Sequence, residues 1–135
     1  MREIIEYMKL LSDQSRLRIL MLLAGRELCV CQIMGALGMS QPLVSRNLSL
    51  LNKAGFLDDR REGKMMFYTA RKKMGLIPRR LLSIVTEGLR NDSLLAADVK
   101  SLGECSEFQK KTGKCGMETY LAYMEQKKKT RKLRP

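Results

Sequence analysis

Glu27-Leu28-Cys29-Val30-Cys31 opens the stretch that decides the fold, and the basic segment Phe56–Ala70 closes it. Between them an apolar-periodic segment runs to Leu37, the short break Gly38-Met39-Ser40 follows, and a second periodic segment begins at Gln41. Apolar residues at helical spacing predict two helices joined by a tight turn, and the alternating pattern of the closing segment predicts a β-hairpin. This order of elements predicts a winged helix-turn-helix, in a fold that is mainly α-helical with a small hairpin as its wing.

The second helix of this unit, predicted for residues 41–54, has two different faces. Val44, Leu48 and Leu51 recur at i, i+4 and i+7, which defines the buried face. Ser40 is placed as the N-cap, and Pro42 falls in the first turn, where its missing N–H costs nothing. The opposite face is polar and charged near its N-terminal end, where a recognition helix meets base edges. The predicted DNA contacts on this helix are Gln41, Ser45, Arg46 and Asn47.

The predicted hairpin, with strands at residues 56–61 and 65–70, carries basic side chains at its tip. A basic tip beside a recognition helix is typical of a wing that contacts phosphate or the minor groove. The formal net charge is +12, and residues 40–73 hold eight basic against three acidic side chains. This surplus on the motif favours a DNA-binding surface over a solvated basic surface. A non-sensing architectural basic protein stays open as an alternative, which an operator footprint confined to one palindrome would exclude. The predicted wing contacts are Arg60, Arg61 and Lys64.

Outside this unit the sequence predicts further helices, at residues 2–11, 13–24, 78–90, 93–102 and 117–128, with Ser12 capping the second. Residues 1–92 are expected to form the DNA-binding and dimerisation domain. Residues 93–135 are expected to form a C-terminal extension, with two cysteines in an irregular stretch at 103–116 and a disordered basic tail from Thr130.

The first helix and the helix after Pro78 carry more apolar surface than one small domain needs, and burial between two subunits is its simplest use. The sequence therefore predicts a homodimer; the alternative is a monomer in which the two helices pack on each other. The apolar residues concerned are Ile4, Ile5, Met8 and Leu11 in one helix and Leu81, Leu82, Val85 and Leu89 in the other.

The composition excludes most kinds of active site. The chain of 135 residues has no histidine, so the commonest general base and the commonest zinc ligand are both missing. It also has no glycine-rich phosphate loop, so neither an enzyme nor an organic cofactor is expected. No apolar run is long enough to span a bilayer, and the charged start Met1-Arg2-Glu3 is unlike a signal peptide, so no membrane contact is expected.

Four segments, in the order and at the spacing found here, resemble the ArsR/SmtB family of metal-sensing repressors: Leu11–Leu20, Glu27–Cys31, Ser40–Leu48 and Asp59–Lys64. Proteins of this family are homodimers that bind operator DNA and release it when a metal or metalloid binds. The resemblance implies the same partners for this chain and a place in the cytoplasm. The chain departs from the family at two positions. Met34 stands where well-known arsenite sensors have a third cysteine, and Asn47 where a histidine is frequent.

The Cys-Val-Cys segment resembles that of the arsenite-sensing and the cadmium- and lead-sensing members. Residues i and i+2 point about 200° apart on a helix but the same way in an extended segment. One ion therefore bridges Cys29 and Cys31 only if the chain is extended, or is pulled out of the helix, at this point. A helix N-terminus is also expected to favour the thiolate form. Binding would reshape the first element of the DNA reader, which supplies the difference between two states that a switch requires.

The third ligand is the open question of the cysteine site. In the sensors that this chain resembles, trivalent arsenic binds three thiolates, and the Met34 thioether is a poor substitute. The third thiolate is expected from Cys105 or Cys115, with Cys105 preferred because it closely follows a predicted helix. Nearby lysines are expected to favour the thiolate form of both.

As(III) is the expected inducer, with Sb(III) as a related one and with Cd(II), Pb(II) or Zn(II) as alternatives that four thiolates would suit. Three further alternatives stay open. Cys105 and Cys115 could form a site of their own, the cysteines could be ordinary buried residues, or they could oxidise in a redox sensor.

Overall fold

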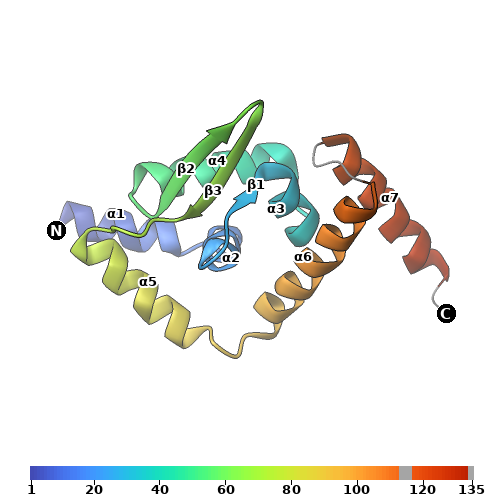
Figure 1. Ribbon diagram of the computed structural model, residues 1–135. Helices are drawn as coiled ribbons and strands as arrows, with labels where there is room; N and C mark the ends of the chain where they lie inside the picture. The colour runs from blue at the N-terminus through green and yellow to red at the C-terminus, as the bar shows by residue number, and fades with distance from the viewer. Residues whose placement is uncertain (113–116, 134–135) are drawn as a thin grey trace.

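The computed structural model describes the backbone of residues 1–112 and 117–133, which form seven helices and three short strands (Figure 1). In chain order the elements are α1 (Arg2–Leu11), α2 (Gln14–Leu23), β1 (Leu28–Cys29), α3 (Val30–Leu37), α4 (Gln41–Lys53), β2 (Leu57–Glu62), β3 (Met65–Ala70), α5 (Leu76–Gly88), α6 (Ser93–Thr112) and α7 (Met117–Leu133). The mainly helical winged helix-turn-helix predicted from the sequence is confirmed.

The helix-turn-helix is formed by α3 and α4, and each side of its turn has a local cause. Gly38 ends α3 in the left-handed region, at φ +67°, and its N–H donates to the carbonyl oxygen of Met34 at 2.8 Å. Ser40 caps α4 as predicted, because its Oγ accepts from the N–H of Leu43 at 3.4 Å. The predicted cap of α2 was wrong. Asp13 rather than Ser12 accepts from the N–H of Arg16, at 3.0 Å.

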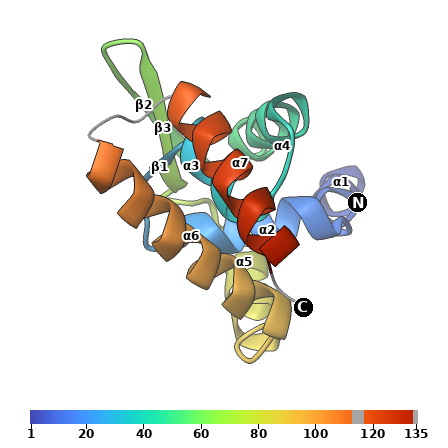
Figure 2. The same ribbon diagram turned by 90° about the vertical axis from the view of Figure 1, so that its right-hand side faces the viewer.

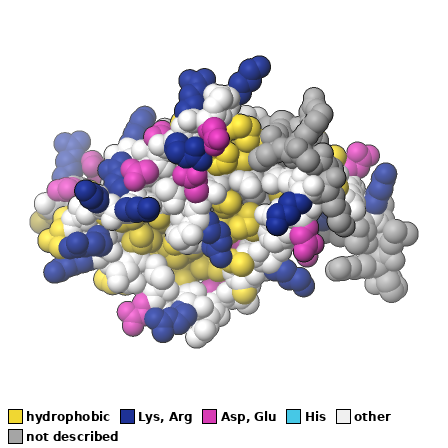
Figure 3. Space-filling view, viewed as in Figure 1, with side chains coloured by type: hydrophobic (Ala, Val, Ile, Leu, Met, Phe, Trp, Pro, Cys, Tyr) yellow, Lys and Arg dark blue, Asp and Glu magenta, His cyan; other side chains and the backbone are white. Residues whose placement is uncertain are grey.

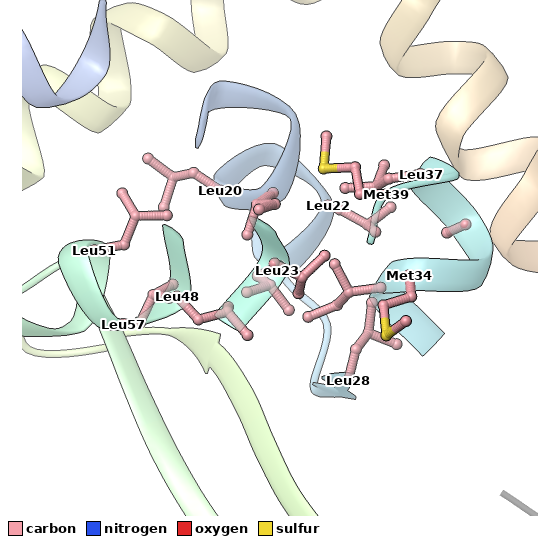
Figure 4. Packing of buried hydrophobic residues seen from close by; sticks show 14 of the residues in the cluster. Leu20, Leu22, Leu23, Leu28, Met34, Leu37, Met39, Leu48, Leu51 and Leu57 are labelled. Carbon is pink, nitrogen blue, oxygen red and sulfur yellow. The ribbon is translucent and has the colours of Figure 1, made fainter. Parts of the chain in front are cut away.

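The hydrophobic core lies between α2, α3, α4 and the base of the wing (Figure 4). The predicted buried face of α4 is confirmed, since Val44, Leu48 and Leu51 are all buried. Helix α2 is buried on more than one side. Leu17 and Met21 are partly buried at its edge, because α2 is covered by α4 on one side and by α3 and α6 on others. Its most buried residues are Ile19, Leu20, Leu22 and Leu23.

The wing is part of a three-stranded antiparallel sheet with the strand order β1-β3-β2. The predicted hairpin of β2 and β3 is present, and it turns at Gly63, whose φ is +61°. The segment before α3 contributes the third strand, β1, with Cys29 opposite Phe67. The same Phe67 lies opposite Arg60 on its other side, so the sheet connects the cysteine segment to the wing.

The C-terminal extension is more helical than its sequence suggests. Helix α6 runs unbroken through Gly103 to Thr112, which contradicts the irregular stretch predicted from residue 103. Glycine inside a helix costs about 1 kcal/mol relative to alanine, but α6 recovers this by burying Leu102 and Cys105. Helix α7 packs against both α3 and α6 (Figure 2), and it continues to Leu133 into the predicted disordered tail.

Helices α1 and α5 lie at the end of the molecule opposite α6 and α7 (Figure 1), and both expose large apolar side chains. Leu81, Leu82 and Val85 of α5 are partly buried against the core. The exposed residues are Ile4, Ile5 and Met8 on α1 and Leu76 and Ile84 on α5.

Candidate nucleic-acid interface and thiol site

The exposed face of α4 carries most of the DNA contacts predicted for this helix. Gln41, Ser45 and Arg46 are exposed, and the buried Val44 and Leu48 on the other face fix the helix against the core. The N-terminal end of α4 therefore presents an amide, a hydroxyl and a guanidinium to solvent, which are the groups that read base edges in a major groove.

Asn47 does not belong to this face, so its prediction as a DNA contact was wrong. Its side chain is 3% exposed, and its Oδ1 accepts from Nη1 of Arg16 at 3.5 Å. Arg16 also donates through Nε to the carbonyl oxygen of Leu10 at 2.6 Å, so this contact connects α4 to the junction of α1 and α2. The spacing already carried the signal, because residue 47 follows Val44 by three positions and lies on the buried face.

The tip of the wing is basic and exposed. Figure 3 shows dark blue side chains gathered at the upper end of the molecule, over the wing of Figure 1. Arg61 and Lys64 are the exposed basic residues there, and Nε of Arg61 donates to the carbonyl oxygen of Gly63 at 3.3 Å. This bond leaves most of the guanidinium donors of Arg61 directed to solvent, as a phosphate contact requires.

Arg60, the third predicted wing contact, is engaged within the protein. Its Nη2 donates to Oε1 of Glu27 at 2.6 Å, and its Nη1 donates to Oε2 of Glu62 at 3.0 Å. Its guanidinium carbon also lies 4.9 Å from the centre of the Phe67 ring. Hydrogen bonding to Arg60 holds the pKa of Glu27 below its ordinary value. Sequence reasoning did not find this pair, because its partners are far apart in the chain.

Cys29 and Cys31 stand where the chain passes from strand to helix. Cys29 is the last residue of β1 and the N-cap of α3, with extended backbone angles, whereas Cys31 already belongs to the first turn of the helix. The N–H of Cys29 donates to Oε1 of Gln32 at 2.9 Å, so Gln32 holds this first turn in place. Cys29 is buried and Cys31 is half-buried. The chain is therefore extended at Cys29, as a bridging ion would require, but the extended segment ends between the two cysteines.

Cys105 approaches this pair from α6. Its side chain is 1% exposed, on the helix that packs along α3 (Figures 1 and 2). The prediction that Cys105 lies in an irregular stretch was wrong. Cys105 is part of the unbroken helix α6, seven residues after Asp98. Cys115, the other predicted ligand, lies outside the described residues.

The pKa values of Cys31 and Cys105 are both raised, which favours the neutral form of these two thiols. Burial, together with the nearby Cys29 and Cys31, raises the pKa of Cys105 to about 11, and Lys127 only partly offsets this. Burial and the nearby Cys29 also raise the pKa of Cys31. The expectation that lysines and the helix N-terminus would favour thiolates at these two positions was wrong, because desolvation of the charged form outweighs both. Helix α6, which carries Cys105, packs along α3, and the pKa of Cys105 responds to both Cys29 and Cys31.

These sulfurs do not yet form a closed coordination shell. Among the residues that the structure describes, no group of three or more His, Cys, Asp or Glu side chains is arranged to hold a metal ion. Cys29 is extended but Cys31 is already helical, so the two do not lie in one extended segment, where residues i and i+2 would point the same way. Opening the first turn of α3 would remove this obstacle.

Comparison with known proteins identifies the family of this chain. Residues 13–59 match the family described as "Bacterial regulatory protein, arsR family". An arsenic resistance transcriptional regulator of Pseudomonas putida is 37% identical over 111 residues, which cover 79% of this chain and 85% of that protein. The chain belongs to the ArsR family.

Other relatives of this ArsR-family chain match over about half of its length. The arsenical resistance operon repressor of Escherichia coli is 48% identical over 65 residues, which cover 47% of this chain and 56% of that protein. A cadmium resistance regulatory protein of Listeria innocua is 38% identical over 63 residues, which cover 46% of this chain and 53% of that protein. The chain thus spans about half the length of these two relatives.

Solved structures agree with the ArsR-family fold. A homodimeric winged helix-turn-helix DNA-binding domain from Mycobacterium bovis, a possible ArsR-family regulator, is 32% identical, with a TM-score of 0.55 over 68% of this chain and 82% of that one. HlyU from Vibrio cholerae, at 23% identity, has a TM-score of 0.58 over 67% of this chain and 95% of that one, and shows the fold alone. Among the described helices of this chain, none is long and apolar enough to cross a membrane.

The ArsR-family match at residues 13–59 ends well before α6, so each contact that docks this helix has one partner outside the matched residues. Asp98 of α6 accepts from Nη2 and Nε of Arg18 at 2.8 Å and 3.0 Å, and Arg18 also donates to the carbonyl oxygen of Leu37 at 3.2 Å. Gln109 of α6 accepts from Nε2 of Gln32 at 3.3 Å. Arg18 and Asp98 are 80 positions apart in the chain, and Gln32 and Gln109 are 77 positions apart. No local sequence pattern predicts contacts at such separations.

Proposed function

We propose that this chain is a transcriptional repressor that binds operator DNA as a homodimer and releases it when As(III) binds the thiols of Cys29, Cys31 and Cys105. The observation that carries the proposal is the approach of Cys105, on α6, to the two cysteines at the start of α3. Helix α3 is the first helix of the DNA reader, so a ligand held there acts directly on the element that positions α4.

The kind of donor supports a soft metalloid. Trivalent arsenic binds thiols in preference to oxygen and nitrogen ligands, and the described part of the cluster supplies three sulfurs, two of them buried. Sb(III) shares this chemistry. Cd(II), Pb(II) and Zn(II) are the second candidates, supported by the relatives that are named for cadmium resistance. Cys115 is not assigned to this site, and a separate site formed by Cys105 and Cys115 is the alternative.

The DNA-binding part of the proposal rests on two exposed basic surfaces. Gln41, Ser45 and Arg46 on α4 would face base edges, while Arg61 and Lys64 at the wing tip would contact phosphates. The exposed apolar side chains of α1 and α5 would be buried between two subunits, as hydrophobic surface of this size usually is. Such a dimer presents two recognition helices to half-sites about one helical turn apart.

Single cysteine variants test the proposal. Cys29→Ser, Cys31→Ser and Cys105→Ser are each expected to bind the operator like the wild type and to keep it when arsenite is added. The measurement is operator affinity by fluorescence anisotropy with and without arsenite, on fully reduced protein.

Cys115→Ser is the matched control, and it is expected to respond like the wild type. Full arsenite-driven release by the double variant Cys29→Ser/Cys31→Ser would refute the shared site and assign sensing to the C-terminal cysteines. Release by Cd(II) or Zn(II) at lower concentration than by arsenite would instead select the second candidate.

A further inference from the structure

One row of residues crosses the sheet from the thiol site to the wing. Cys29 on β1 lies opposite Phe67 on the central strand β3, and Phe67 lies opposite Arg60 on β2. The Arg60 guanidinium covers the Phe67 ring at 4.9 Å. A displacement of the Cys29 backbone therefore acts first on β3, the strand that separates Cys29 from the strand that carries Arg60.

Glu27 connects the two ends of this row. It lies two residues before Cys29, and its carboxylate reaches across the sheet to Arg60, which donates through Nη2 at 2.6 Å and through Nε at 3.2 Å and 3.3 Å. Nη1 of the same guanidinium donates to Glu62, within the wing, at 3.0 Å. With all three of its nitrogens engaged, Arg60 connects elements of the protein and is not arranged as a phosphate contact.

The segment that carries Glu27 is also the one that a shared ligand would move. The N–H of Cys29 is held by Gln32, and Gln32 in turn donates to Gln109 of α6 at 3.3 Å. Cys29 is extended and Cys31 is already helical, whereas one extended segment would point both side chains the same way. A ligand shared by both sulfurs is therefore expected to open the first turn of α3 and to shift the backbone around Cys29.

We propose that Glu27 is a positioning residue that passes the state of the thiol site to the wing through Arg60. With the thiols free, Glu27 holds Arg60 over Phe67 and fixes the wing against β1. When the start of α3 opens, Glu27 withdraws, the wing loses this support, and its tip no longer meets phosphate in register with α4. This regulation rests on the proposed function, and it adds a route from the ligand to the DNA that does not pass through α4.

Two variants of equal charge separate this role from simple electrostatics. Glu27→Gln and Glu62→Gln each remove one negative charge and one Arg60 partner, but only Glu27 connects Arg60 to the cysteine segment. Removal of a negative charge near DNA raises affinity, so Glu62→Gln is expected to bind the operator as tightly as the wild type or more tightly. Glu27→Gln is expected to bind about two- to fivefold more weakly without arsenite, the range of one surface ion pair.

The second measurement is the ratio of operator dissociation constants with and without saturating arsenite. Glu62→Gln is expected to keep the wild-type ratio and Glu27→Gln to lose a large part of it, while direct ultraviolet titration shows unchanged arsenite binding by both. Equal melting temperatures confirm that both variants fold. This inference would be overturned if Glu27→Gln and Glu62→Gln had the same arsenite-free operator affinity and the same ratio of operator dissociation constants. A wild type that keeps its operator at saturating arsenite would instead overturn the proposed function, and the arsenite-free comparison would still test the support of the wing.

Discussion

Replacement of Asp98 by asparagine is expected to weaken the docking of α6 on the DNA-binding unit. The Asp98 carboxylate is 5% exposed and accepts two hydrogen bonds from Arg18, at 2.8 Å and 3.0 Å. The same guanidinium donates to the carbonyl oxygen of Leu37, at the end of α3. Asp98→Asn keeps the size of the side chain but removes its charge and sets amide N–H groups against the guanidinium.

The expected loss can be estimated from the two known limits. Removal of one partner from a buried ion pair costs about 3–5 kcal/mol, and an exposed pair contributes at most about 1 kcal/mol. Arg18 is 20% exposed and keeps its bond to Leu37, so its charge is not left uncompensated in a dry interior. We therefore expect a loss of about 2 kcal/mol in the free energy of unfolding, between these limits.

Urea unfolding followed by circular dichroism measures this loss, and the reactivity of Cys105 toward a thiol reagent reports the docking of α6 itself. Both are expected to change in Asp98→Asn, and the arsenite affinity is expected to fall because Cys105 is less often in place. Asp58→Asn is the matched control, since it removes an exposed ion pair with Arg71 and leaves α6 untouched. A loss in Asp98→Asn no larger than in Asp58→Asn, with unchanged thiol reactivity, would refute the assignment of Asp98 as the anchor of α6.

Three further predictions concern DNA binding and pH. Arg46→Ala is expected to weaken specific operator binding by about 1–3 kcal/mol, whereas Lys64→Ala should weaken all sequences alike and lower the salt slope by about 1, in anisotropy titrations at several salt concentrations. Arsenous acid condenses with thiols and releases water, whereas a divalent cation displaces a proton from each thiol, so Cd(II) affinity should rise with pH while arsenite affinity stays nearly flat. Because the pKa of Cys105 rises from 9.0 to about 11 in the fold, the stability that its neutral thiol contributes is present below pH 9 and is lost as pH rises toward 11, which unfolding at graded pH measures.

Local signals were sufficient for the DNA-binding half of the fold. The periodic residues of α4, its Ser40 cap and the glycine that ends α3 are decided within a few residues, so the helix-turn-helix was predictable. The cap of α2 was not, because Ser12 and Asp13 are adjacent and both are good N-caps. The burial of Asn47 was available from spacing, but a polar side chain beside Arg46 suggested the DNA face.

The thiol site depended on packing that a single sequence does not encode locally. Gly103 and the polar residues after it resemble a loop, and only the burial of Leu102 and Cys105 against α3 keeps α6 helical. The pKa values followed the same rule. Sequence neighbours suggested thiolates, whereas the tertiary environment, burial near two other sulfurs, favours neutral thiols.

The position of Cys105 on a helix changes the energetics expected of a third ligand. A cysteine in a flexible loop would lose backbone freedom at about 1–2 kcal/mol for each residue that binding orders. Cys105 has already lost this freedom in the free protein, since α6 is docked by Asp98 at one end and by Gln109 at the other. The part that must still move is the first turn of α3, held by Gln32 and joined through the sheet to Glu27 and the wing. Under the proposed function, ligand binding at the sulfurs therefore acts on the start of α3 and, through the sheet, on the wing that would contact DNA. A repressor needs its ligand to act on these elements.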